Sequence, residues 1–168
     1  MTLGQYEVWL QGAQRDTHSA SFYIEAFKRP YLTGKLNATT EQGGALVAAK
    51  RALVDMQFNY ISGGVAAELP VNITALTQNS TPYFAEYDEY QFHTASTELT
   101  RPHVVVDKTA LQLDQQGAAQ LPITLVPSAS VQDLVVEASF MDPSGQIQSV
   151  QQRQPLWPAQ VVVGVQHS

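Results

Sequence analysis

The feature that most constrains the fold of this chain is a two-residue alternation of apolar and polar side chains, repeated in short runs along most of its length. Residues 54–60 are the clearest run, because Val54, Met56, Phe58 and Tyr60 alternate with polar residues. Each run predicts a strand with one buried face, since strand side chains point alternately to the two faces. Similar runs occur at 6–10, 22–26, 69–75, 90–92, 104–106, 111–113, 121–125, 134–140 and 161–165. Many short strands predict an all-β sandwich or barrel, and we expect an antiparallel Ig-like sandwich.

Turn residues separate the predicted strands. Asp142-Pro143-Ser144-Gly145 joins a Pro, which presets φ, to a Gly, which accepts a positive φ. Gly63-Gly64 and Gln115–Gly117 mark two further turns. We expect the strand over 54–60 to pair antiparallel with the strand over 69–75 through the turn at Gly63-Gly64, with Val54, Met56, Phe58 and Tyr60 on one face.

One stretch departs from the strand pattern. Residues 44–53 contain several good helix formers and could form two or three helical turns. The strand alternation begins directly after them, so we expect a loop that runs into a strand, and we expect any helix in the chain to be confined to this stretch.

A weak internal repeat suggests how the chain is divided. Residues 6–10 precede a polar hairpin and a second strand, and residues 135–140 precede the Asp142 turn and another strand; Glu7 and Glu137 lie 130 residues apart. Repeats of domain size indicate an array. We therefore interpret 1–30 as the last strands of a preceding domain and 31–153 as a complete domain. Residues 154–168 are then a linker with the first strand of a next domain, or else the closing strand of the same sandwich, in a chain excised from a larger protein.

Composition excludes several functions. The net charge of −6 and the absence of any Lys/Arg run argue against binding nucleic acid. The absence of cysteine excludes disulfides, thiolate zinc sites and cysteine nucleophiles. No P-loop, G-x-G-x-x-G, G-x-S-x-G or H-E-x-x-H motif occurs. We therefore expect no enzymatic activity, catalytic residue, cofactor or metal.

The polar candidates for a site are few. His93 and His103 could meet across a sheet, but two imidazoles with no third ligand make a poor zinc site, and we interpret them as polar strand ends. Glu86, Asp88 and Glu89 form an acidic cluster, which we interpret as charges that protect an exposed edge strand rather than as a calcium site.

Aromatic residues are unusually dense in one segment, which holds Tyr83, Phe84, Tyr87, Tyr90 and Phe92. Exposed, they could form a sugar-binding platform. We favour the view that alternate members fill the sandwich core while the others pack on a neighbouring module. Trp157, between two prolines, is interpreted as a rigid interdomain plug.

Several strings, in the same order, resemble the bacterial α2-macroglobulin family. Residues 4–8 resemble its G-x-Y-x-V strand, and residues 21–27 resemble its S-F-x-V-E-E-F closing strand. Residues 60–71 resemble its Y-L-F-G-A-P-A-A-G-L-P-V hairpin, and residues 82–87 resemble the P-F-x-x-Y stretch that follows. Residues 157–164 resemble the next interdomain junction.

The departures from the family limit what the resemblance implies. Gly63-Gly64-Val65 stands where the family has Gly-Ala-Pro, and the thioester motif Cys-x-x-Gln is absent, as is any recognisable bait segment. In the family a protease cuts the bait, the molecule rearranges and the thioester can capture the protease. The resemblance thus implies a macroglobulin domain that acts as a scaffold.

The function expected from this resemblance is that of a non-catalytic structural module of a periplasmic protease-trapping or envelope-defence protein. Its partners would be neighbouring domains of the parent chain, and proteases through the parent alone; any membrane anchor would belong to the parent. The alternative is a carbohydrate- or surface-binding Ig-like module, whose glycan binding would be lost on Tyr83→Ala or Tyr87→Ala. A small hydrolase is a third reading, disfavoured by the absent motifs.

Overall fold

A computed structural model describes residues 4–11, 16–24, 30–92 and 101–166, the first two ranges as backbone. The chain forms two compact units, Met1–Pro30 and Tyr31–Ser168. In unit 1, β1 (Gly4–Gln11) pairs antiparallel with β2 (Asp16–Ile24) as a hairpin whose register shifts between Val8 and Trp9.

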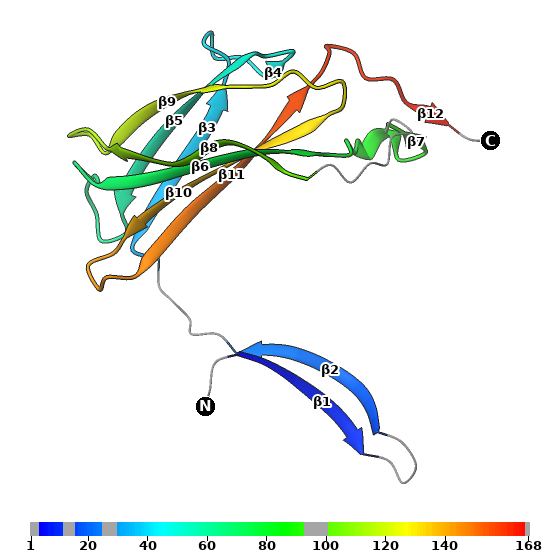
Figure 1. Cartoon of the computed structure of the whole chain (residues 1–168), viewed down its shortest axis with the longest axis horizontal. Helices are drawn as coiled ribbons and strands as arrows, with labels where there is room; N and C mark the ends of the chain where they lie inside the picture. The colour runs from blue at the N-terminus through cyan, green and yellow to red at the C-terminus, as the bar shows by residue number, and fades with distance from the viewer. Residues whose placement is uncertain (1–3, 12–15, 25–29, 93–100, 167–168) are drawn as a thin grey trace. The chain divides into compact units, whose positions relative to one another are not determined.

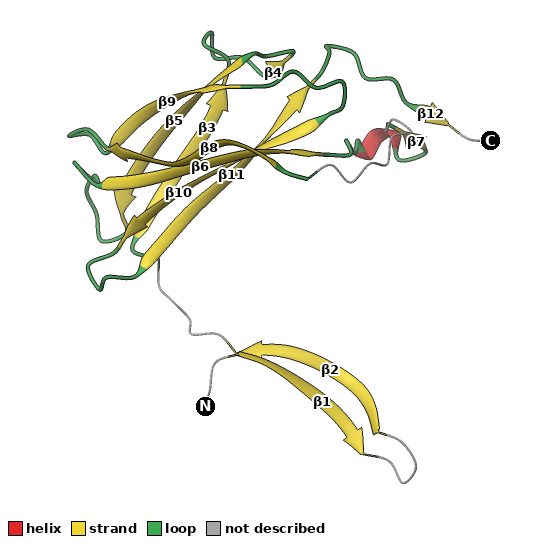
Figure 2. Cartoon of the chain, in the orientation of Figure 1, coloured by secondary structure: helices red, strands yellow, loops and turns green. Residues whose placement is uncertain are grey.

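The prediction of an all-β fold is confirmed. The described residues contain strands and one three-residue 3-10 helix, η1 (Ala85–Tyr87), but no α-helix (Figure 2). Within 44–53 the chain forms the short strand β4 (Leu46–Val47) and then enters β5 (Arg51–Tyr60), so the expected loop leading into a strand is correct. No helix in the described part of the chain has the length and apolarity needed to cross a membrane.

Unit 2 is a sandwich of two sheets (Figure 1). The larger sheet has the order β4, β11 (Ile147–Trp157), β10 (Gln132–Met141), β6 (Pro70–Asn79) and β8 (His103–Gln112). All its pairings are antiparallel except the parallel one between β4 and β11. The smaller sheet is antiparallel, with the order β3 (Leu32–Thr39), β5 and β9 (Ala118–Thr124). A two-residue pairing joins β7 (Tyr90–Gln91) to β12 (Val165–Gln166).

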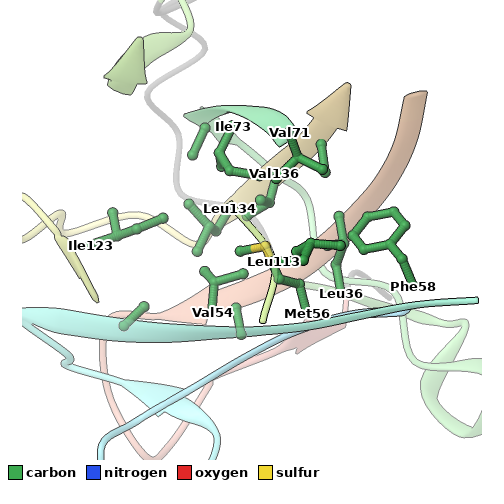
Figure 3. Packing of buried hydrophobic residues seen from close by; sticks show 14 of the residues in the cluster. Leu36, Val54, Met56, Phe58, Val71, Ile73, Leu113, Ile123, Leu134 and Val136 are labelled. Carbon is green, nitrogen blue, oxygen red and sulfur yellow. The ribbon is translucent and has the colours of Figure 1, made fainter. Parts of the chain in front are cut away.

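The hydrophobic core lies between the two sheets (Figure 3). Val54, Met56 and Phe58 of β5 are buried, Tyr60 is half-buried beside the core, and the polar residues between them are only half-buried, so the predicted facing of this strand is confirmed. The larger sheet contributes residues such as Ile73, Leu134, Val136 and Phe140, and the rings of Phe58 and Phe140 meet edge to face at 6.0 Å.

The predicted pairing of residues 54–60 with 69–75 is wrong. Strand β5 pairs with β3 and β9, whereas β6 pairs with β10 and β8 in the other sheet. Residues 61–69 therefore carry the chain from one sheet to the other instead of closing a hairpin. The apolar faces of the two strands are opposed across the core. Both strands therefore show the same alternation of apolar and polar residues that they would show if they were neighbours in one sheet.

Two turns have the same Asp-x-x-Gly construction. In each, the Gly N–H donates to the Asp carbonyl, at 3.0 Å for Gly117 to Asp114 and 2.9 Å for Gly145 to Asp142. The Asp carboxylate oxygen Oδ1 accepts backbone N–H groups from two following residues in both turns. Both glycines have positive φ, 73° and 79°, which explains the residue type. The turns predicted at residues 115–117 and 142–145 are thereby confirmed.

Candidate functional site

The candidate site is an aromatic groove of about 640 Å³ beside the β4–β11 end of the sandwich. Four of its residues come from the segment between β6 and β8, namely Phe84, Tyr87, Tyr90 and Phe92. Strands β4 and β11 contribute Val47 and Trp157, and the following tail contributes Gln160, Val162 and Gly164, with Ala45 and Ala159 completing the lining.

Ring contacts hold the groove together. Phe84 meets Phe92 edge to face at 4.7 Å and stacks on Trp157 at 6.1 Å with 23° between the planes. Tyr90 contacts both Tyr87, at 6.1 Å, and Phe92, at 6.4 Å. Such ring pairs contribute beyond the apolar area they bury. The aromatic segment thus forms a cluster of its own around half-buried Phe84 and Phe92.

This placement corrects the predicted role of the aromatic segment. None of its described aromatic residues belongs to the sandwich core, so alternate members do not fill it. Tyr83, a candidate for sugar stacking, has 76% of its surface exposed and does not line the groove, whereas Tyr87 does. Trp157 is half-buried and packs within this cluster.

The chain after β11 closes one side of the groove. Val165 of β12 pairs with Gln91 of β7. Gly164 lets the Phe92 ring approach, because a Cβ there would lie 2.6 Å from Phe92 Cε1. The side-chain amide of Gln166 also donates to the Glu89 carboxylate. The strand predicted over 161–165 is much shorter than expected, with strand pairing at Val165–Gln166 and irregular backbone before it.

The acidic residues are neighbours in the chain of two groove residues, Tyr87 and Tyr90. Glu86 is in η1 and Asp88 and Glu89 follow it, so the predicted edge-strand location is wrong. All three are exposed. Within the described residues no group of three His, Asp or Glu side chains is placed to hold a metal. His103 is exposed at the start of β8, opposite Thr77, and its proposed neighbour His93 lies outside the described residues.

Elsewhere, the clearest electrostatic effect is at a turn. The Ser144 hydroxyl, and then the Gln146 backbone N–H, lower the pKa of Asp142 below its ordinary value of 3.8 by donating to the carboxylate. The other oxygen accepts from the Gln148 side chain at 2.9 Å, and Gln148 accepts from the Tyr31 N–H at 3.0 Å. This carboxylate therefore ties the β10–β11 turn to the start of β3, which is a structural role.

The lining of the groove is largely apolar. Its described lining contains aromatic rings, aliphatic side chains and one amide, and none of these lining residues is a Ser, Thr, His, Asp or Glu. A nucleophile paired with a base, which acyl or glycosyl transfer needs, is thus missing from this lining. The largely aromatic and aliphatic character of the walls is typical of a surface that buries apolar groups of a partner.

Comparisons with solved structures point to one group of proteins. A Salmonella alpha-2-macroglobulin reacted with methylamine is 20% identical, with a TM-score of 0.73, over 98% of this chain and 10% of that one. The native form of the E. coli alpha-2-macroglobulin is 18% identical, with a TM-score of 0.71, over 97% and 10%. The trypsin-activated E. coli protein is 17% identical, with a TM-score of 0.68, over 97% and 11%.

No family model matches this sequence, and no curated protein does. At this level of identity the structural likeness establishes the fold. This chain spans about a tenth of the length of the proteins that it matches. The resemblance to bacterial α2-macroglobulins read from the sequence is therefore confirmed in the structure: the chain has the fold of a segment of these proteins.

Proposed function

We propose that this chain is a non-catalytic structural module of a larger, periplasmic, α2-macroglobulin-like protein that traps proteases. The observation that carries the proposal is the fold match, which covers 98% of this chain but a tenth of the related one. The absence of cysteine supports a scaffold role, because a thioester cannot reside in this segment. Two of the similar structures are E. coli proteins activated by trypsin or by porcine elastase, and we infer that the parent of this module also meets proteases.

The division of the module follows from its two terminal hairpins. A shift of 130 residues carries β1 onto residues 134–141 of β10 and β2 onto residues 146–154, nearly all of which lie in β11. The register agrees as well: Glu7 lies opposite Ser21, and Glu137 lies opposite Gln151. This agreement supports reading residues 1–30 as the closing hairpin of a preceding domain and 31–153 as a complete domain.

The tail supports a domain on the other side. Val161, Val163 and Val165 alternate along it and have 75%, 76% and 57% of their surfaces exposed, while Val162 and Gly164 face the groove. A row of exposed valines on an alternating segment is typical of a strand whose partner is elsewhere. Strand β11 ends at Trp157, so of residues 154–168 we assign those after Trp157 to a linker and the first strand of a next domain.

Hydrogen exchange tests this division within the chain itself. Strand β10 pairs with a strand on each side, whereas β1 pairs with β2 in an isolated two-stranded hairpin, which is marginally stable in water. Amides of residues 4–11 should therefore exchange much faster than those of residues 134–141. Equal protection of the two hairpins would contradict the assignment of residues 1–30 to an incomplete domain.

Protease challenge tests the scaffold role. The purified chain is incubated with trypsin, elastase and an unrelated protease, and both its integrity and their activity on a large protein substrate are followed. We expect trimming of residues 1–30 and nicking in loops, survival of a core from about Leu32 to Arg153, and no loss of protease activity. Stoichiometric inhibition or a covalent protease adduct would show that the chain is an inhibitor by itself.

A further inference from the structure

We propose that the aromatic groove binds a basic, apolar peptide segment of a protein partner. The inference goes beyond the scaffold function and does not depend on it. It rests on two features: a wall of aromatic rings that is open to solvent, and three exposed carboxylates, here called the acidic rim, on residues adjacent in the chain to two of these rings.

The aromatic wall provides the apolar part of the recognition. Tyr87 and Tyr90 line the groove and still have 53% and 40% of their surfaces exposed, so their rings are available to a ligand. The stack of Phe84 on Trp157 gives the wall a fixed shape. The aliphatic stems of Arg and Lys pack well on such surfaces, and their cationic groups are attracted to the faces of Trp and Tyr rings.

The acidic rim provides the charge. Glu86 and Asp88 flank Tyr87 in the chain and Glu89 precedes Tyr90, so the Cα atom of each acidic residue is about 3.8 Å from the Cα atom of a groove residue. Charges on exposed neighbours of groove residues act on a ligand in the groove over the Debye length, which is about 8 Å in physiological salt. The described lining contains no Lys or Arg that could neutralise the rim. The groove therefore attracts a cation and opposes an anion.

The same features disfavour the other occupants. A neutral glycan needs several converging hydrogen-bond partners, and the described lining offers the Gln160 amide and the tyrosine hydroxyls. A second copy of this chain would bring a net charge of −6 toward an acidic rim. In a peptide in which aliphatic residues alternate with Arg or Lys, the aliphatic side chains can pack on the aromatic wall and the cationic groups can pair with the carboxylates of the acidic rim.

The experiment titrates the full chain, carrying Trp9→Phe so that Trp157 is the single fluorophore, with three capped peptides. Leu alternates with Arg in the first, with Gln in the second and with Glu in the third. We expect the Arg peptide to change the Trp157 emission saturably and to bind at least about threefold more tightly than the Gln peptide, with the advantage lost in high salt. The Glu peptide should bind more weakly than the Gln peptide.

Matched variants separate the two parts of the site. A triple variant that removes the three carboxylates should bind the Arg peptide only as tightly as the Gln peptide. Its substitutions are Glu86→Gln, Asp88→Asn and Glu89→Gln. The control makes the same charge change elsewhere, at exposed Glu41, Glu68 and Asp107, and should keep the preference for Arg.

The wall is tested in the same way. Tyr87→Ala should weaken both the Arg and the Gln peptide about tenfold, as expected for an aromatic anchor, whereas Tyr83→Ala, in the same segment but outside the groove, should weaken neither. Equal affinity for the Arg and Glu peptides, saturable binding of cellohexaose in their place, self-association of the chain that involves Trp157, or no binding at all would each overturn the proposal.

Discussion

Replacing Gly117 by Ala should destabilise the sandwich far more than the same change at Gly145, although both glycines occupy the same place in an Asp-x-x-Gly turn. At either position Ala is forced to a positive φ, 73° or 79°, which costs about 1 kcal/mol. The surroundings differ. A Cβ on Gly145 meets nothing within 4 Å, whereas a Cβ on Gly117 would lie 2.6 Å from the carbonyl oxygen of Phe58 and 3.0 Å from the nitrogen of Ala66.

The contact at Gly117 cannot be relieved cheaply. The Phe58 oxygen already accepts the Ala66 N–H at 3.0 Å, and the Phe58 N–H donates to the Gly117 oxygen at 2.9 Å. Moving either backbone segment would loosen these bonds next to a ring in the centre of the core. Overpacking of this kind costs about 1–3 kcal/mol, so the total for Gly117→Ala is about 2–4 kcal/mol, against about 1 kcal/mol for Gly145→Ala.

Urea and thermal unfolding of the two single variants test the difference. One kcal/mol corresponds to about 3–5 °C for a unit of this size, so Tm should fall by about 3–5 °C for Gly145→Ala and by about 6–20 °C for Gly117→Ala. The urea m-value should be unchanged if the fold is retained. Equal losses in the two variants would show that the backbone angle alone matters and that the turn after β8 does not pack on Phe58 as described.

Three further changes have defined outcomes. Phe58→Ala should cost about 3–5 kcal/mol in urea unfolding, because the ring is fully buried in the core. The pKa of Asp142 is lowered in the folded chain, so its carboxylate stabilises the fold above pH 3.8, and this stabilisation is lost as pH falls through the folded pKa. At neutral pH Asp142→Asn should therefore have a lower Tm than the unchanged chain, and the difference between the two Tm values should shrink below pH 3.8. In the Trp9→Phe background, Gly164→Ala should displace the Phe92 ring and alter the Trp157 emission while leaving the Tm of the sandwich nearly unchanged, because the contact lies outside the core.

For the central strands β5, β6 and β10 the sequence was sufficient to predict which residues are buried, but not which strands pair. It was not sufficient for the runs at 104–106 and 161–165, where Val104, Val161 and Val163 are exposed. Alternation in β5 identifies its buried face, because a one-residue slip would expose Val54, Met56 and Phe58 together. It carries no information about the neighbour, since residues facing across a sandwich show the same alternation as residues sharing a sheet. The glycines at 63 and 64 suggested a hairpin, but the connection formed by residues 61–69 is long enough to cross from one sheet to the other.

The groove illustrates a second limit of sequence reasoning. The density of aromatic residues at 83–92 was visible, yet their number says nothing about whether they enter the main core. Two signals could have separated the cases. Apart from residues 90–92 the segment lacks regular alternation, and Glu86, Asp88 and Glu89 occur within it. Carboxylates that close to buried rings would require desolvation, which is costly without a partner. The contribution of Trp157 and Val162 could not be predicted, because it depends on a tail returning from another part of the chain.

The internal repeat was the most informative of the weak sequence signals, because it relates the pairing of two hairpins as well as the residues of their strands. A chance hairpin near the N-terminus would share with β10–β11 only the alternation that any strand has. Here the register also agrees: Gly4 opposite Ile24 corresponds to Leu134 opposite Gln154, and Val8 opposite Ala20 corresponds to Ala138 opposite Val150. The agreement ends at the irregularity after Val8, which inserts one residue into one strand. Because β10 in the complete sandwich also pairs with β6, β1 should bind the equivalent strand of a preceding domain along its free edge, and the fast exchange expected for β1 in this chain should disappear when that domain is joined to it.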